Sequence, residues 1–150
     1  MKSKINWGII GLGKIAKKFA SDLLLSKKAN LYAVASRDFE KAKLFGKKYS
    51  SVKYFGSYEE LAKDPEIDIV YIATPHVFHF ENTILCLNNN KAVLCEKPLG
   101  VDSAKVKAML EKAKSKKLFL RLVSFFMVLL LLGVSTSFCL QAIRLKNSRE

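Results

Sequence analysis

The segment from Ile5 to Leu25, INWGIIGLGKIAKKFASDLLL, constrains the fold of this chain more than any other stretch. It opens with an apolar run that suits a buried strand, and its second half repeats apolar residues at helical spacing. Between the two lies a turn with the pattern G-x-G-x-x-A, formed by Gly11, Gly13 and Ala16. The segment predicts a strand, a tight turn and a helix, the first unit of a parallel α/β sheet.

Each small residue of this turn has a physical reason. Gly11 lets the chain leave the strand sharply, Gly13 lets a pyrophosphate approach the backbone, and Ala16 lets the helix pack closely on the strand. The helix N-terminus then offers free N–H groups and a partial positive charge to phosphates. The pattern favours a dinucleotide held by Gly11, Leu12, Gly13, Lys14 and Ile15, although alone it also occurs in ordinary strand–helix turns.

Strands and helices alternate through the rest of the chain, which predicts a doubly wound parallel sheet of the Rossmann type with right-handed crossovers. We expect the inward face of the second helix to include Leu44, and that of the last helix to include Leu110. The further expected strands are 31–35, 53–56, 67–73 and 91–95, and the further expected helices are 39–49, 57–63, 77–87 and 101–117.

The formal net charge of +13 prompts the question of nucleic-acid binding. The lysines form small groups at the ends and outer faces of the expected helices, with no aromatic residues interleaved, so we predict a solvated surface and no nucleic-acid partner. Cys86, Cys95 and Cys139 lack metal-ligand or redox-pair spacing, which predicts no metal site and favours a reducing, cytoplasmic compartment. The short apolar run before Gly11 does not suit a secretory signal.

The second expected strand ends at Ser36-Arg37-Asp38, where a dinucleotide fold meets the adenosine ribose. A hydroxyl and a guanidinium suit a 2′-phosphate better than two bare hydroxyls, so NADP(H) is favoured, with NAD(H) as the alternative. It also stays open that Asp38 only caps the next helix and that Arg37 is an ordinary surface residue.

Ligands of open α/β sheets lie beyond the carboxyl ends of the strands. Three informative groups fall at such ends: Gly11–Ala16, Thr74–His79 and Glu96–Pro98. Their coincidence at one edge of the expected sheet predicts that this fold binds a ligand there.

These motifs in this order resemble the Gfo/Idh/MocA oxidoreductase family, which includes glucose–fructose oxidoreductase and inositol dehydrogenase. The resemblance rests on the glycine turn, Ser36-Arg37-Asp38, ATPHVFH at 73–79 and KAVLCEKPLG at 91–100, and covers about residues 5–120. SYEELAKDP at 57–65 and the wording LCEKPLGV look closest to the NADP-linked dihydrodiol dehydrogenase branch.

The resemblance implies hydride transfer between a nicotinamide and a carbon of a sugar, inositol or cyclic diol. It places Lys97 beside the nicotinamide and the substrate oxygen as the catalytic residue, and Glu96 on the ribose side of the cofactor. Thr74, His76 and His79 would line the dinucleotide groove. The two histidines have plain alternatives, a polar residue at a helix start for His76 and a packed core histidine for His79.

In this family a second domain follows and supplies most of the substrate pocket, whereas this chain continues into residues 122–143 without one charged side chain. We therefore divide the chain into an NADP(H)-binding domain, 1–120, and a hydrophobic tail, 121–150. The tail is interpreted as a frameshift or truncation product, with a membrane anchor or a buried terminal segment as alternatives. Cofactor binding is expected more than turnover, and a non-catalytic nucleotide-binding or membrane-tethered module is the alternative function.

Overall fold

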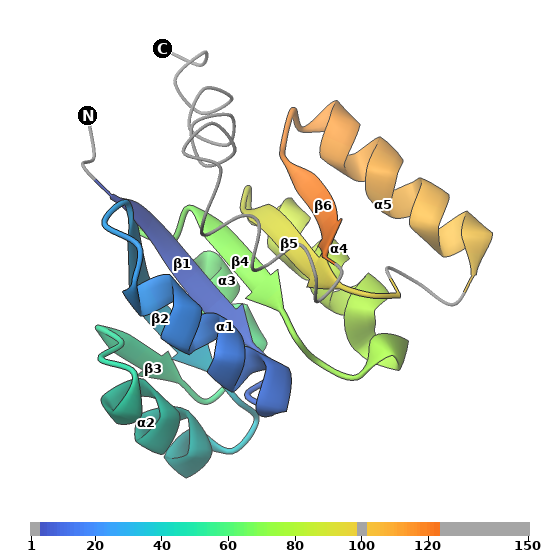
Figure 1. Ribbon diagram of the computed structural model, residues 1–150. Helices are drawn as coiled ribbons and strands as arrows, with labels where there is room; N and C mark the ends of the chain where they lie inside the picture. The colour runs from blue at the N-terminus through green and yellow to red at the C-terminus, as the bar shows by residue number, and fades with distance from the viewer. Residues whose placement is uncertain (1–3, 99–101, 124–150) are drawn as a thin grey trace.

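The computed structural model describes residues 4–98 and 102–123, and these form a three-layer α/β domain (Figure 1). All paired strands run parallel, in the sheet order β3-β2-β1-β4-β5-β6. The strands are β1 (Ile5–Ile10), β2 (Ala29–Ala35), β3 (Lys53–Phe55), β4 (Ile69–Ile72), β5 (Ala92–Glu96) and β6 (Leu120–Val123). The helices are α1 (Lys14–Leu24), α2 (Phe39–Lys48), α3 (Tyr58–Lys63), the short 3₁₀ turn η1 (His76–Phe78), α4 (His79–Asn88) and α5 (Ser103–Ser115).

Two hydrophobic clusters lie on opposite faces of the sheet. On one face, α1 and α2 pack through Phe19 and Phe45. On the other face, Leu61 of α3, Leu87 of α4 and Ala113 of α5 pack against the remaining strand side chains. Because both faces are covered, the central strands read as nearly continuous apolar runs, and the predicted Rossmann fold is confirmed.

Side-chain caps set the starts of three helices. Asp38 Oδ1 accepts a hydrogen bond from the Lys41 N–H at 3.1 Å, and Ser57 Oγ accepts one from the Glu60 N–H at 3.2 Å. Asp102 caps α5 in the same way, through the N–H of Ala104. The capping role that the sequence left open for Asp38 is therefore observed.

Two helix faces differ from the sequence expectation. Leu44 of α2 is 68% exposed and Leu110 of α5 is 50% exposed, although both were expected to point inward. Successive residues of a helix point about 100° apart. Leu44 lies beside the buried Phe45 in α2, and Leu110 lies beside the buried Met109 in α5, so each is turned away from the narrow buried stripe of its helix.

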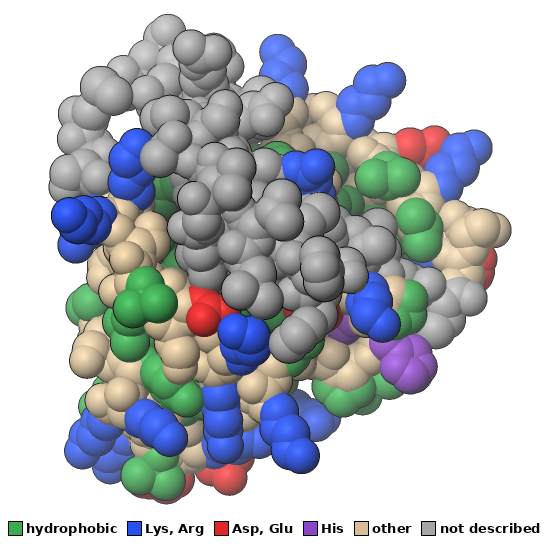
Figure 2. All heavy atoms as spheres, in the orientation of Figure 1, with side chains coloured by type: hydrophobic (Ala, Val, Ile, Leu, Met, Phe, Trp, Pro, Cys, Tyr) green, Lys and Arg blue, Asp and Glu red, His purple; other side chains and the backbone are tan. Residues whose placement is uncertain are grey.

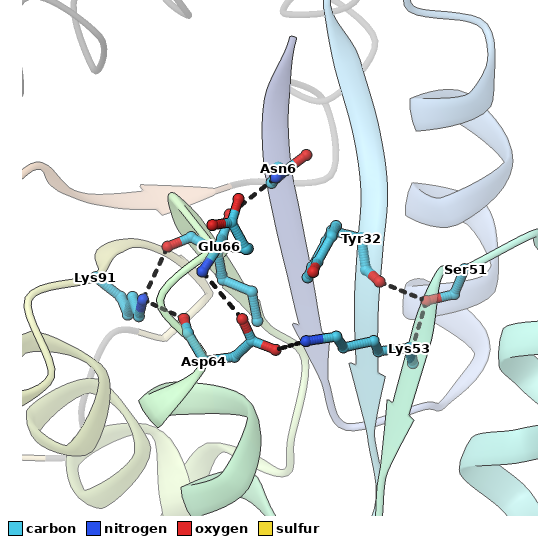
Figure 3. A network of polar contacts seen from close by, with 8 residues as sticks. Asn6, Tyr32, Ser51, Lys53, Asp64, Glu66 and Lys91 are labelled. Carbon is cyan, nitrogen blue, oxygen red and sulfur yellow. Dashed lines mark hydrogen bonds and ion pairs between the residues drawn. The ribbon is translucent and has the colours of Figure 1, made fainter. Parts of the chain in front are cut away.

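A polar network at the amino ends of the strands fixes the connection between α3 and β4 (Figure 3). The buried Lys91 ammonium donates to the carbonyl oxygens of Asp64 at 2.5 Å and Ile67 at 2.9 Å. The Asp64 carboxylate accepts from Lys53 Nζ at 2.6 Å and from the Glu66 N–H at 3.0 Å. This network lies at the edge of the sheet opposite the predicted ligand site, so its role is structural.

Strand β6 runs to Val123 and pairs with β5, so the sheet continues past the domain boundary expected at residue 120. Within residues 4–98 and 102–123, no helix combines the length and apolar character that crossing a bilayer requires. The predicted tail and the apolar segment 122–143 lie, from residue 124 onward, outside the described residues.

Candidate functional site

The two glycines of the opening turn have different surroundings. Gly11 has a φ of 83°, and a Cβ placed on it would come within 2.5 Å of the backbone of Ala73 and Thr74. Gly13 is exposed, and a Cβ there would meet nothing within 4 Å. Gly11 therefore allows the exits of β1 and β4 to touch, whereas Gly13 leaves open space at the start of α1.

Among the described residues, no side chain caps the N-terminus of α1. Gly13 is the N-cap and provides no side chain to accept a hydrogen bond, so within the described chain the first N–H groups have no side-chain cap. Leu12 is buried and anchors the turn, Ile15 is half-buried, and Lys14 is exposed beside the opening. Free N–H groups at the positive end of a helix form an arrangement that binds phosphate oxygens.

The turn after β2 lies near the end of η1. The Arg37 guanidinium lies 5.6 Å from the centroid of the Phe78 ring, and both side chains are exposed. Ser36 is buried, and its Oγ accepts a hydrogen bond from the Asp38 N–H at 3.2 Å. Burial raises the pKa of the neighbouring Tyr58, and the positive charge of Arg37 partly offsets that effect. The turn after β2 thus combines an exposed cation with a hydroxyl and aromatic surface.

The exit of β4 is held by a buried histidine. His79 Nε2 lies 2.8 Å from the Thr74 carbonyl oxygen, and its Nδ1 lies 2.6 Å from the carbonyl oxygen of Pro98. The ring is 1% exposed, so its position is that of the packed core histidine. His76 is exposed at the start of η1. His79 connects the exits of β4 and β5, and only His76 of the two presents an open ring.

Asn82 also supports this exit, a role that the sequence analysis did not find. Its Nδ2 donates to Thr74 Oγ1 at 3.0 Å, and both side chains are buried. The spacing of Asn82 from His79 on α4 puts both side chains on the helix face toward Thr74, and that periodicity is the signal that was available.

The exit of β5 brings a buried carboxylate next to an exposed amine. Glu96 is 6% exposed, and its Oε1 accepts a hydrogen bond from the hydroxyl of Tyr71 on β4. Burial raises the pKa of Tyr71, and the hydrogen bond to Glu96 raises it further, so this hydroxyl stays a donor. Lys97 follows directly and is exposed. The sequence indicated only that Tyr71 lies within the expected strand 67–73.

The described cysteines do not take part in this edge chemically. Cys86 and Cys95 are buried and unpaired. Burial raises the pKa of each thiol to about 12, which disfavours the reactive thiolate. They behave as small core residues.

Contacts therefore join the three predicted segments at the carboxyl edge. Gly11 abuts the exit of β4, and His79 bridges that exit to the turn after β5. On the molecular surface, lysine and arginine side chains are spread over several parts of the visible face, with hydrophobic and acidic side chains between them (Figure 2). The carboxyl edge of the sheet, where these contacts meet, is the candidate site.

Comparison with known families decides what this edge belongs to. The family described as "Oxidoreductase family, NAD-binding Rossmann fold", Gfo/Idh/MocA, matches residues 5–123. The chain belongs to this family. It carries the NAD(P)-binding Rossmann domain of Gfo/Idh/MocA oxidoreductases, and the match includes all described strands.

Among curated relatives, the chain is similar to trans-1,2-dihydrobenzene-1,2-diol dehydrogenase of Mus musculus, with 48% identity over 118 residues. The corresponding protein of Homo sapiens is 46% identical over 118 residues. In both comparisons the match covers 77% of this chain and 35% of the relative. The chain thus spans about a third of the length of these relatives.

Solved structures give the same result. A 3-ketoreductase from Actinomadura kijaniata in complex with NADP and TDP-benzene matches with a TM-score of 0.77 and 29% identity, over 79% of this chain and 37% of that one. Myo-inositol 2-dehydrogenase from Lactobacillus plantarum matches with a TM-score of 0.73 and 27% identity, over 80% and 36%. The shared part is the Gfo/Idh/MocA dinucleotide domain.

Proposed function

We propose that this chain binds NADP(H) across the carboxyl edge of its sheet, as the dinucleotide domain of an oxidoreductase acting on a cyclic diol, a sugar or an inositol. The single observation that carries the proposal is the open N-terminus of α1, where Gly13 leaves space and no side-chain cap competes within the described chain. A diphosphate fits the chemistry of this terminus, because free N–H groups bind anionic oxygens.

The preference for NADP(H) over NAD(H) rests on the turn after β2. Arg37 is exposed there, whereas Asp38, the acidic residue that could take a ribose hydroxyl pair, uses its carboxylate to cap α2. A guanidinium forms strong hydrogen bonds to a phosphate, and its positive charge attracts the negative charge of the phosphate. The 3-ketoreductase neighbour with NADP bound is consistent with this preference.

We assign the remaining predicted residues by their positions. Ser36 and Arg37 would hold the adenosine end, and Leu12, Gly13, Lys14 and Ile15 would surround the diphosphate beside Gly11. Thr74 and His76 would border the groove, and Glu96 and Lys97 would stand at its nicotinamide end. His79 would act from beneath, by holding backbone carbonyls of both flanking turns.

A bound nicotinamide supplies hydride transfer to or from a substrate carbon. The chain's own contribution at that end would be Lys97, whose exposed amine can hold or release a proton at a substrate oxygen. Glu96, buried behind it, would orient the ribose side through its carboxylate oxygens. Nucleotide binding without turnover is the second candidate function.

Titration of the full chain with NADPH and with NADH, followed by calorimetry, tests the proposal. We expect the chain to bind both nucleotides, with a higher affinity for NADPH than for NADH. Failure to bind either nucleotide would overturn the proposed function, and tighter NADH binding would overturn the NADP(H) preference alone. Oxidation of a trans-dihydrodiol by the same preparation would favour the enzyme over the binding module.

A further inference from the structure

A buried tyrosine joins the helix of the glycine turn to the turn that carries Lys97. The Tyr71 ring on β4 stacks on Phe19 of α1, with centroids 3.9 Å apart and an interplanar angle of 19°. The Tyr71 hydroxyl donates to the Glu96 carboxylate at the end of β5. Both Tyr71 and Glu96 are buried, so this pair is shielded from water.

The strand register explains why the hydroxyl reaches this carboxylate. Tyr71 pairs with Leu94 across β4 and β5, and Glu96 lies two residues further along on the same face of the sheet. A tyrosine side chain is long enough to span this diagonal, whereas Val70 and Ile72 on either side of it point to the opposite face of the sheet. The stacking on Phe19 fixes the ring plane and thereby the direction of the hydroxyl.

We propose that Tyr71 is a positioning residue for the dinucleotide site, which holds the Glu96 carboxylate, and with it the Lys97 turn, in register with α1. This role rests on the proposed binding of NADP(H). The physical chain runs from the phosphate-binding end of α1 through Phe19 and Tyr71 to Glu96. Without the hydroxyl, a buried carboxylate oxygen loses its donor and turns toward other partners.

The alternative is that Tyr71 serves only to stabilise the core. The two roles differ in whether the effect of the Tyr71 hydroxyl on nucleotide affinity depends on the Glu96 carboxylate. A core role lowers stability when the hydroxyl is removed, but leaves the nucleotide affinity of the folded protein unchanged. A positioning role lowers that affinity, and does so only while the Glu96 carboxylate is present.

The test uses Tyr71→Phe in the full chain, because this change removes the hydroxyl and keeps the ring that stacks on Phe19. We expect NADPH to bind about tenfold more weakly, equivalent to ~1.4 kcal/mol. Tyr54→Phe is the matched control, since Tyr54 is a partly buried tyrosine on β3 that packs against Phe39 on the far side of the sheet order. Its NADPH affinity should equal that of the wild type.

The same comparison is made in a Glu96→Ala background, with circular dichroism confirming that each variant is folded. There Tyr71→Phe should weaken NADPH binding no further. The positioning role would be overturned if folded Tyr71→Phe bound NADPH as tightly as the wild type. It would also be overturned if Tyr71→Phe weakened NADPH binding equally in the Glu96→Ala background. In both cases NADPH binding by the wild type would still uphold the proposed function. Absence of NADPH binding by the wild type would overturn both.

Discussion

The glycines at 11 and 13 occupy one turn but answer to different physical demands. At Gly11, the positive φ and the close contact with the exit of β4 exclude a side chain. Gly13 faces open space, so only a ligand would exclude a side chain there. One glycine serves the fold and the other serves the proposed ligand.

Substituting each glycine separates these demands. We expect Gly11→Ala to lower the free energy of unfolding by about 3 kcal/mol, because the left-handed backbone and the overlap with Thr74 add up. Gly13→Ala should change it by less than about 1 kcal/mol, yet weaken NADPH binding about tenfold. Urea unfolding and calorimetric titration measure the two effects, and unchanged NADPH affinity in Gly13→Ala would contradict a diphosphate at this turn.

We propose that Arg37 is the residue that distinguishes NADP(H) from NAD(H). We expect Arg37→Ala to weaken NADPH binding by about tenfold or more while leaving NADH binding unchanged, because it removes a charge-assisted hydrogen bond to the 2′-phosphate alone. Lys47→Ala, which removes an equal charge from the exposed end of α2, is the control and should affect neither. Equal losses for both nucleotides in Arg37→Ala would argue against the assignment.

At the scale of elements, the Asp64 carboxylate is one of the groups that hold the connection between α3 and β4. Burial raises the pKa of Asp64, but the hydrogen bonds from Lys53 and from the Glu66 N–H outweigh burial, so that the pKa of Asp64 lies below its usual 3.8. The hydrogen bond from Lys53 correspondingly raises the pKa of that lysine. A carboxyl group with a lowered pKa stabilises the folded state above its unfolded pKa and loses this contribution as the pH falls through the folded one.

Asp64→Asn should therefore lower the free energy of unfolding by roughly 1 kcal/mol at pH 7, since an amide cannot replace the ion pair. The difference from the wild type should shrink as the pH falls below the usual Asp value of 3.8. Urea unfolding at pH 7 and at pH 3 measures it. A difference that grows on acidification would contradict a lowered pKa of Asp64 in the folded state.

At the scale of the whole molecule, the last strand among the described residues, β6, runs to Val123. Residues 124–143 carry no charged side chain, so we expect a chain ending at Val123 to be more soluble than the full chain while keeping every strand pairing. The supernatant fraction after expression and centrifugation measures solubility. A chain ending at Lys117 should be less stable than either, because it also lacks β6, and equal solubility of the full chain and the chain ending at Val123 would contradict the expectation.

The order of strands and helices could be predicted because apolar spacing reports which side of an element is buried. The glycine turn and the cap at Asp38 were predictable for a similar reason, since both depend on a few neighbouring residues. The exposure of Leu44 and Leu110 was not, because how wide a stripe each helix buries depends on what packs against it. The local sequence pattern therefore predicted the strands and helices, but not which of their side chains are in contact.

The sequence by itself determined the alternating elements, the positive-φ glycine and the placement of three chemical segments at strand ends. Only the tertiary structure decided that His79 is enclosed between two backbone carbonyls and that the Tyr71 hydroxyl meets Glu96. The physical reason is range: backbone conformation and helical periodicity act within a few residues, whereas these contacts need the register between β4 and β5, which the packing of the whole sheet sets.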